Sequence, residues 1–188
     1  QGVQRAGELQ IGDIAGDKKS IELPDSQKIL YNEVMKLGKP TIFINISGSC
    51  VSLIDQDKDC DAVIQCFYGG AESGVALANV LFGKASPSGR LPVTFYKSDD
   101  DLPDFRDYSM ENRTYKYFKG EPLYKFGYGL TYGDIEEKWI NENEVVLTNK
   151  GGMDTDYSVL KFKYEPHPEL LDFKKIFIRV GESITVRF

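Results

Sequence analysis

The stretch from Phe67 to Phe95 restricts the possible folds most, because neighbouring local patterns in it agree with one another. The apolar run Ala62 to Tyr68 is typical of a buried strand, and Gly69-Gly70 interrupts it. Apolar residues then recur over 73–82 with helical spacing, and Gly83 is a favourable left-handed stop. The stretch therefore predicts a strand, a turn and a helix in the closing part of a layered α/β domain.

The segments on either side fit the same domain. Leu91 to Phe95 follows a Pro87-Ser88-Gly89 turn and is β-prone, so we expect a strand there. Thr41 to Ile46 is a continuous β-branched and aromatic run, typical of a strand covered on both faces, and Ser26 to Leu37 before it has helical spacing. Ser47-Gly48-Ser49 then lies at the carboxyl end of that strand, where ligands often bind in open α/β sheets. A plain strand-to-helix turn is the alternative reading.

Segment 97–132 has few aliphatic residues and many Asp, Tyr, Pro and Gly residues, which predicts a linker. Its aromatic side chains offer rigid amphipathic area that can fasten a chain to a domain surface, and they also suit stacking against sugars. Both roles stay open, with packing favoured. The residues concerned are Phe105, Tyr108, Tyr115, Tyr117, Phe118, Tyr124, Phe126, Tyr128 and Tyr132.

From Gly133 the pattern changes to short β segments in which apolar residues such as Val145, Leu147 and Val159 alternate with polar ones. Such alternation indicates one buried face per strand. A sandwich usually needs about seven strands and about 100 residues, so a reduced or shortened sandwich is expected. The predicted strands are 135–140, 144–147, 159–164, 175–180 and 183–188.

Composition excludes several classes of partner. The chain has 188 residues, 41% of them hydrophobic, and a net charge of -6 with interspersed signs, so we expect neither nucleic acid nor membrane as a partner. No apolar run approaches the roughly 20 residues that span a bilayer. The opening QGVQRAGELQ has neither an initiator Met nor the regions of a signal peptide, which indicates a piece of a longer protein.

Three groups of reactive side chains are read as structural. Cys50, Cys60 and Cys66 match no zinc spacing and are expected to be buried free thiols, which leaves the compartment open. The alternating Asp residues of 55–61 lack the later Gly and Glu of a calcium loop, so a solvated acidic connector is favoured. His167, the single histidine, lies between two prolines and is expected to be a solvated loop residue.

Two long segments carry a family resemblance. The run GVALANVLFGKASPSGRLPVTF, with LPDFRDYSMENRTYKYFKGEPLYKFGYGLTY after it, resembles the second domain of glycoside hydrolase family 3 and its exit linker, in the form of the β-xylosidase branch. The ending ELLDFKKIFIRVGESITVRF resembles the fibronectin type III-like domain that follows in this family. The resemblance implies three parts: 1–98, the C-terminal part of an α/β sandwich domain; 99–132, an aromatic-rich linker; and 133–188, a short fibronectin type III-like β-sandwich.

The resemblance also implies a reaction. Family 3 enzymes of this kind are retaining β-glycosidases that release terminal β-linked xylose or glucose from oligosaccharides, using two carboxylates. The nucleophilic Asp belongs to an N-terminal (β/α) barrel that this chain does not contain. The acid/base Glu precedes a Gly-Asp-Arg and Leu-Pro motif, and Glu8 falls at the matching place before Gly16-Asp17-Lys18 and Leu23-Pro24.

Two departures bear on Glu8. Its distance in sequence to Asp17 is a few residues shorter than usual, and Lys18 replaces an Arg, which loses the bidentate fork of the guanidinium. An exposed loop acid is the alternative reading of Glu8. No metal and no organic cofactor is implied, and we expect the isolated chain to be inactive. The alternative function is a non-catalytic accessory module that binds glycan or stabilises a partner.

Overall fold

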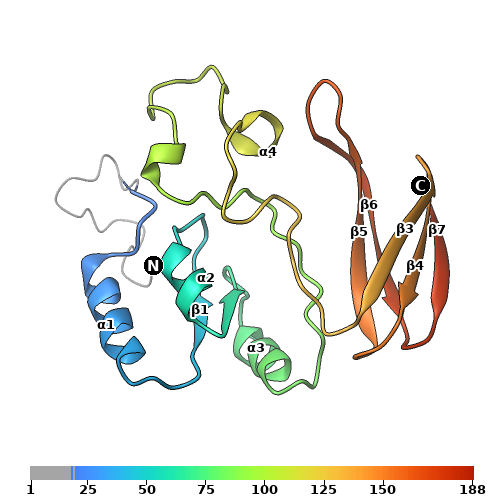
Figure 1. The fold of residues 1–188 in the computed structure, drawn as a ribbon, viewed down its shortest axis with the longest axis horizontal. Helices are drawn as coiled ribbons and strands as arrows, with labels where there is room; N and C mark the ends of the chain where they lie inside the picture. The colour runs from blue at the N-terminus through green and yellow to red at the C-terminus, as the bar shows by residue number, and fades with distance from the viewer. Residues whose placement is uncertain (1–17, 19) are drawn as a thin grey trace. The chain divides into compact units, whose positions relative to one another are not determined.

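The computed structural model describes residue 18 and residues 20–188 (Figure 1). The chain divides into two compact units. The first unit is Gln1–Ser73, Thr94–Arg113 and Phe118–Tyr124. The second unit is Gly74–Val93, Thr114–Tyr117 and Lys125–Phe188. The chain therefore passes more than once between the units.

The first unit contains a helix–strand–helix–strand succession. Helix α1 (Asp25–Met35) precedes strand β1 (Ile42–Asn45), and helix α2 (Ile54–Asp59) precedes strand β2 (Ala62–Gln65). The strands are parallel, with Ile42 opposite Ala62, as expected for a right-handed crossover through a helix. A short 3₁₀ helix, η1 (Asp99–Asp101), lies in a later segment of this unit.

Sequence periodicity located the helices better than the strand ends. Helix α1 begins one residue before the predicted helix and ends two residues before its predicted end, and Gly38 after it has a φ of 60°, the left-handed conformation of a helix stop. Strand β2 ends at Gln65 rather than Tyr68. Phe67 has a φ of 50°, a left-handed conformation that an extended strand does not allow.

The prediction of a strand at Leu91 to Phe95 is wrong. The segment forms only an isolated antiparallel bridge between Phe95 and Tyr124. Pro92 lacks a backbone N–H and so interrupts a ladder of hydrogen bonds. The acidic segment 55–61 was expected to be a solvated connector. Instead, Asp55, Asp57 and Asp59 lie on helix α2.

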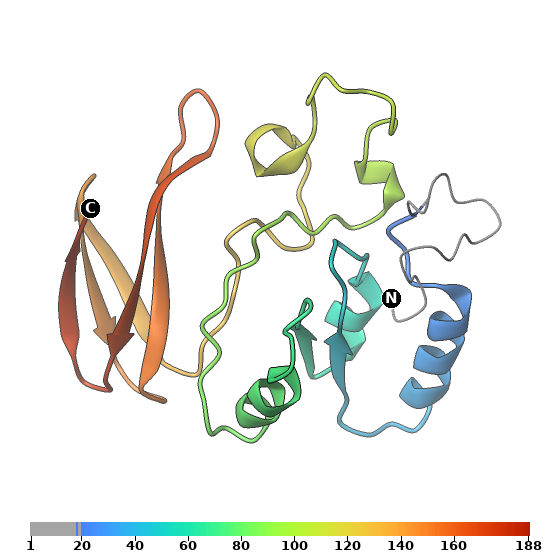
Figure 2. The ribbon, with the colours of Figure 1, turned by 180° about the vertical axis from the view of Figure 1, so that it is seen from behind.

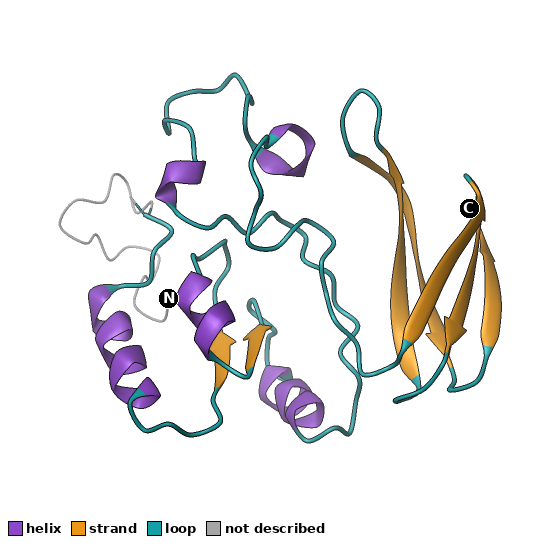
Figure 3. Ribbon diagram, in the orientation of Figure 1, coloured by secondary structure: helices purple, strands orange, loops and turns teal. Residues whose placement is uncertain are grey.

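Helix α3 (Ser73–Leu81) and the short helix α4 (Thr114–Tyr117) precede five antiparallel strands (Figure 3). Strand β3 (Ile135–Asn141) pairs with β4 (Glu144–Asn149), and β4 pairs with β7 (Ser183–Arg187). Strands β5 (Thr155–Lys163) and β6 (Glu169–Ile178) form a long hairpin, visible from behind in Figure 2. The helix predicted for 73–82 and the predicted β segments are confirmed, with shifted ends.

The two small sheets share one hydrophobic core in the second unit. Along β4 the burial alternates, and Val145 and Leu147 are fully buried, as the sequence pattern predicted. Val159 of β5 and Ile178 of β6 join them from the other sheet, and Val186 joins from β7. A core to which two packed sheets both contribute side chains is the defining feature of a sandwich.

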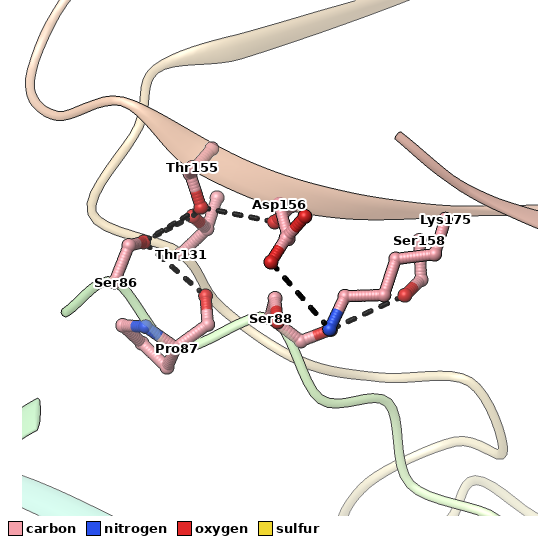
Figure 4. A network of polar contacts seen from close by, with 8 residues as sticks. All are labelled: Ser86, Pro87, Ser88, Thr131, Thr155, Asp156, Ser158 and Lys175. Atoms are coloured by element: carbon pink, nitrogen blue, oxygen red, sulfur yellow. Dashed lines mark hydrogen bonds and ion pairs between the residues drawn. The ribbon is translucent and has the colours of Figure 1, made fainter. Parts of the chain in front are cut away.

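A ring of three hydroxyl groups attaches two loop segments to strand β5 (Figure 4). Ser86 Oγ lies 2.7 Å from Thr131 Oγ1, Thr131 Oγ1 lies 2.7 Å from Thr155 Oγ1, and Thr155 Oγ1 lies 2.8 Å from Ser86 Oγ. The backbone N–H of Tyr132 also donates to Ser86 Oγ, over 3.0 Å. Because Thr155 is only 2% exposed, the ring is largely shielded from competing water.

Aromatic packing attaches helix α4 and a further loop residue to the same hairpin. The rings of Tyr115 and Phe126 are stacked at 4.2 Å, and Phe162 of β5 meets Phe126 edge-on at 6.1 Å. Lys116 Nζ lies 3.1 Å from Glu169 Oε1. These contacts support the packing role of the aromatic residues. By contrast, Tyr108 is 84% exposed.

Candidate functional site

The carboxyl ends of β1 and β2 carry a buried polar network. Asn45 and Gln65 are opposite one another in the register of the two strands. Asn45 Nδ2 donates to Gln65 Oε1 over 2.5 Å and to Ser47 Oγ over 3.0 Å. Gln65 Nε2 donates to the carbonyl of Ser47 over 3.0 Å, and Ser47 Oγ donates to the carbonyl of Ser49 over 2.9 Å. The side chains thereby fix the loop that follows β1.

This network favours the structural reading of Ser47. Its side chain is 0% exposed and is occupied by internal hydrogen bonds, so it is not available to a ligand. At Gly48, an added Cβ would lie 2.6 Å from Cε2 of Tyr68, whose ring covers this position and is otherwise 69% exposed. Ser47-Gly48-Ser49 is therefore a fixed turn, and Tyr68 is the exposed side chain at this edge.

Lys18 contacts the same loop from an earlier part of the chain. Its Nζ donates to the carbonyl of Cys50 over 3.2 Å. Burial lowers the pKa of Lys18, while the nearby Cys50 thiol and Asp99 carboxylate act in the opposite direction. Burial also raises the pKa of the Cys50 thiol, which favours its neutral form. This hydrogen bond therefore connects Lys18, which follows Asp17, to the segment after β1.

Glu8, Gly7, Gly16 and Asp17 lie outside the described residues. The structure thus brings Lys18 to the carboxyl edge of the sheet and leaves the geometry of Glu8 unassigned. The Asn45–Gln65 pair was not foreseen from the sequence. A polar amide near the end of each of two apolar strands is the sequence pattern that indicates such a pair.

The other reactive side chains have structural surroundings. Cys50, Cys60 and Cys66 are free thiols, as predicted, but are partly rather than fully buried. His167 is also partly buried, and its ring lies 5.0 Å from that of Tyr117. Within residues 18 and 20–188, no three His, Cys, Asp or Glu side chains gather as metal ligands would. None of the described helices has the length and hydropathy to cross a membrane.

We expect Gln65→Leu to lower the free energy of unfolding of the first unit by about 1 to 3 kcal/mol, because it leaves buried donors and acceptors of Asn45 and Ser47 unpaired. Urea denaturation followed by hydrogen exchange at β1 and β2 measures this. Asn32→Leu, an exposed change in the same unit, is the control and should stay within about 0.5 kcal/mol of the parent. Equal effects of the two variants would contradict a stabilising network.

The comparisons with known proteins agree with the fold. Residues 3–132 match the glycosyl hydrolase family 3 C-terminal domain. The chain is 38% identical over 186 residues to a xylan 1,4-beta-xylosidase of Xylanibacter ruminicola, covering 90% of this chain and 22% of the relative. It is 28% identical to a periplasmic beta-glucosidase of Salmonella typhimurium, covering 93% of this chain and 27% of the relative.

Solved structures give the same result. A GH3 exo-beta-xylosidase in complex with a xylobiose aziridine activity-based probe superimposes with a TM-score of 0.79 at 24% identity, covering 92% of this chain and 28% of that one. The beta-glucosidase of Listeria innocua superimposes with a TM-score of 0.77 at 25% identity, covering 94% and 29%. The chain belongs to glycoside hydrolase family 3 and contains its C-terminal domain, with mixed helix and sheet content.

Proposed function

We propose that this chain supplies the acid/base side of a retaining β-glycosidase that releases terminal β-linked xylose, or secondly glucose, from oligosaccharides. The observation that carries the proposal is the 38% identity to a xylan 1,4-beta-xylosidase over 90% of the chain. Because the chain spans 22% of that relative's length, the nucleophile is assigned to an N-terminal (β/α) barrel outside this sequence.

Glu8 is the proposed acid/base residue. As a general acid it gives a proton to the departing glycosidic oxygen, and as a general base it then takes a proton from the water that releases the sugar. In retaining enzymes the two carboxyl groups lie about 5 to 5.5 Å apart. Lys18 supports this role, because its bond to the Cys50 carbonyl ties the motif after Glu8 to the carboxyl edge of the sheet.

The remaining residues are proposed as a scaffold for that site. Residues 1–98 belong to the α/β sandwich domain, 99–132 form the aromatic-rich linker, and 133–188 form a short fibronectin type III-like sandwich. The five strands and shared core of the second unit support the last assignment. The hydroxyl ring and the Tyr115–Phe126 stack support a linker that is held in place.

We expect the purified 188-residue chain to show no turnover of aryl β-xylosides or β-glucosides, because one carboxylate of the pair is absent. A fusion that joins the chain to the N-terminal region of the Xylanibacter ruminicola relative should hydrolyse them. Product release followed by absorbance measures both. Turnover by the chain alone would contradict the division of the site, and an inactive but folded fusion would favour the alternative, a non-catalytic glycan-binding or accessory module.

A further inference from the structure

Strand β6 is an open edge in the second unit. In the part of the chain that the structure describes, its one neighbour in the sheet is β5. Asp172 to Lys175 all pair with residues of β5, yet they and Leu171 are all exposed. Ile178, at the end of the same strand, is fully buried. The middle of β6 therefore has one edge paired with β5 and a second edge that faces solvent.

One face of this open edge is apolar. Phe173 is 64% exposed and Phe177 is 51% exposed. Because successive side chains of a strand point to opposite faces, the two rings share one face, and Ile176 and Ile178 point the other way, into the core. A phenylalanine ring that becomes covered buries about 150 to 250 Å². An apolar face beside an open strand edge is a surface suited to another strand.

The backbone of Phe173 lies at the open edge. Its N–H donates to Oδ1 of Asp172, the residue before it, over 2.7 Å. In an antiparallel ladder the N–H and the C=O of one residue point toward the same neighbouring strand. Both groups of Phe173 therefore point away from β5, and they can exchange two hydrogen bonds with an incoming strand.

The charges of the edge select one register for a second copy of β6. A two-fold axis normal to the sheet keeps each side chain on its own face, and the residue on the axis opposes its own copy. With Asp172, Lys174 or Lys175 on the axis, like charges lie directly opposite, which is destabilising. With Phe173 on the axis, the two phenylalanines meet and Asp172 opposes Lys174 of the second copy, twice in each dimer.

We propose that β6 is a self-association surface, at which two copies of this chain join edge to edge and antiparallel about a two-fold axis at Phe173. Lysines on a strand edge usually discourage pairing. Here an aspartate two residues before Lys174 makes the same charges complementary to a second copy, so the surface matches itself. The two β5–β6 hairpins then form one four-stranded sheet. The proposal does not depend on the catalytic role of Glu8.

The test is sedimentation equilibrium of the 188-residue chain over a series of concentrations. A reversible equilibrium between monomer and dimer is expected, and it is weak because the contact is at the small end of specific interfaces. Asp172→Lys should weaken dimerisation by roughly tenfold or more, because both charge pairs of the dimer change from attraction to repulsion. Asp172→Lys combined with Lys174→Asp exchanges the charges and should restore dimerisation to within about threefold.

Glu142→Lys is the matched control, because it makes the same change of charge at an exposed position of the same unit outside β6. It should leave the dissociation constant unchanged. Phe173→Ser keeps the charges and removes the apolar contact, and it should also weaken the dimer. The Tm of each variant at low concentration should stay within about 4 °C of the parent, which separates lost association from lost folding.

Three results would overturn the proposal. A chain that stays monomeric at every concentration would exclude self-association. A dimer that persists unchanged in Asp172→Lys and in Phe173→Ser would exclude β6 as its surface. A dimer weakened by Asp172→Lys but not restored by the charge exchange would exclude the register centred on Phe173.

Discussion

Glu8→Gln in the fusion with the N-terminal region of the Xylanibacter ruminicola relative should suppress turnover of β-xylosides with poor leaving groups by about 10² to 10⁴-fold. The same variant should retain far more activity on substrates with activated phenolate leaving groups. The loss depends on the leaving group, because a general acid protonates the departing oxygen and an activated phenolate departs readily without that proton. A series of aryl xylosides of graded leaving-group pKa measures the difference.

The control for this experiment is Asp13→Asn. Asp13 is an acid of the same glycine-rich segment but belongs to no motif. It should leave the dependence on leaving group unchanged. Equal losses across all leaving groups for Glu8→Gln would make Glu8 a positioning residue. The acid/base would then have to be sought among Asp13, Asp17 and Glu22.

Phe95→Ala should have the second largest effect and should lower the free energy of unfolding of the first unit by about 3 to 5 kcal/mol. Phe95 is 0% exposed, its ring lies 6.3 Å from that of Tyr124, and its backbone exchanges two hydrogen bonds with that residue. Removal of the ring leaves a cavity that close-packed neighbours fill only in part. Hydrogen exchange at the amides of β1 and β2, together with urea denaturation, measures the loss.

Phe105→Ala is the matched control, because this side chain in the same unit is 68% exposed. It should change the free energy of unfolding by no more than about 0.5 kcal/mol. A similarly small loss for Phe95→Ala would show that residues 94–96 are not part of the core of this unit.

The helices and the sandwich strands could be predicted because their patterns are local. Helix α3 combines helical spacing with a glycine stop, and β4 alternates buried and half-buried residues along its whole length. The strand predicted at 91–95 failed for a reason that propensity does not capture. Its β-prone residues surround Pro92, and its backbone bonds go to Gly127, Tyr128 and Tyr124 rather than to a neighbouring strand.

The candidate site could be predicted only in part. Glu8 follows from the resemblance alone, because none of the sequence's other carboxylates is marked by periodicity or burial. The Asn45–Gln65 pair depends on the register of two strands, which places residues 20 positions apart in direct contact.

The acid/base assignment of Glu8 is the central claim, and azide tests it most directly. In the Glu8→Gln fusion, azide can attack the glycosyl intermediate without help from a general base, so it replaces the step that the variant has lost. We predict that added azide restores part of the rate on an activated aryl xyloside and that β-xylosyl azide accumulates as the product. No change in rate and xylose as the sole product would contradict the assignment of Glu8.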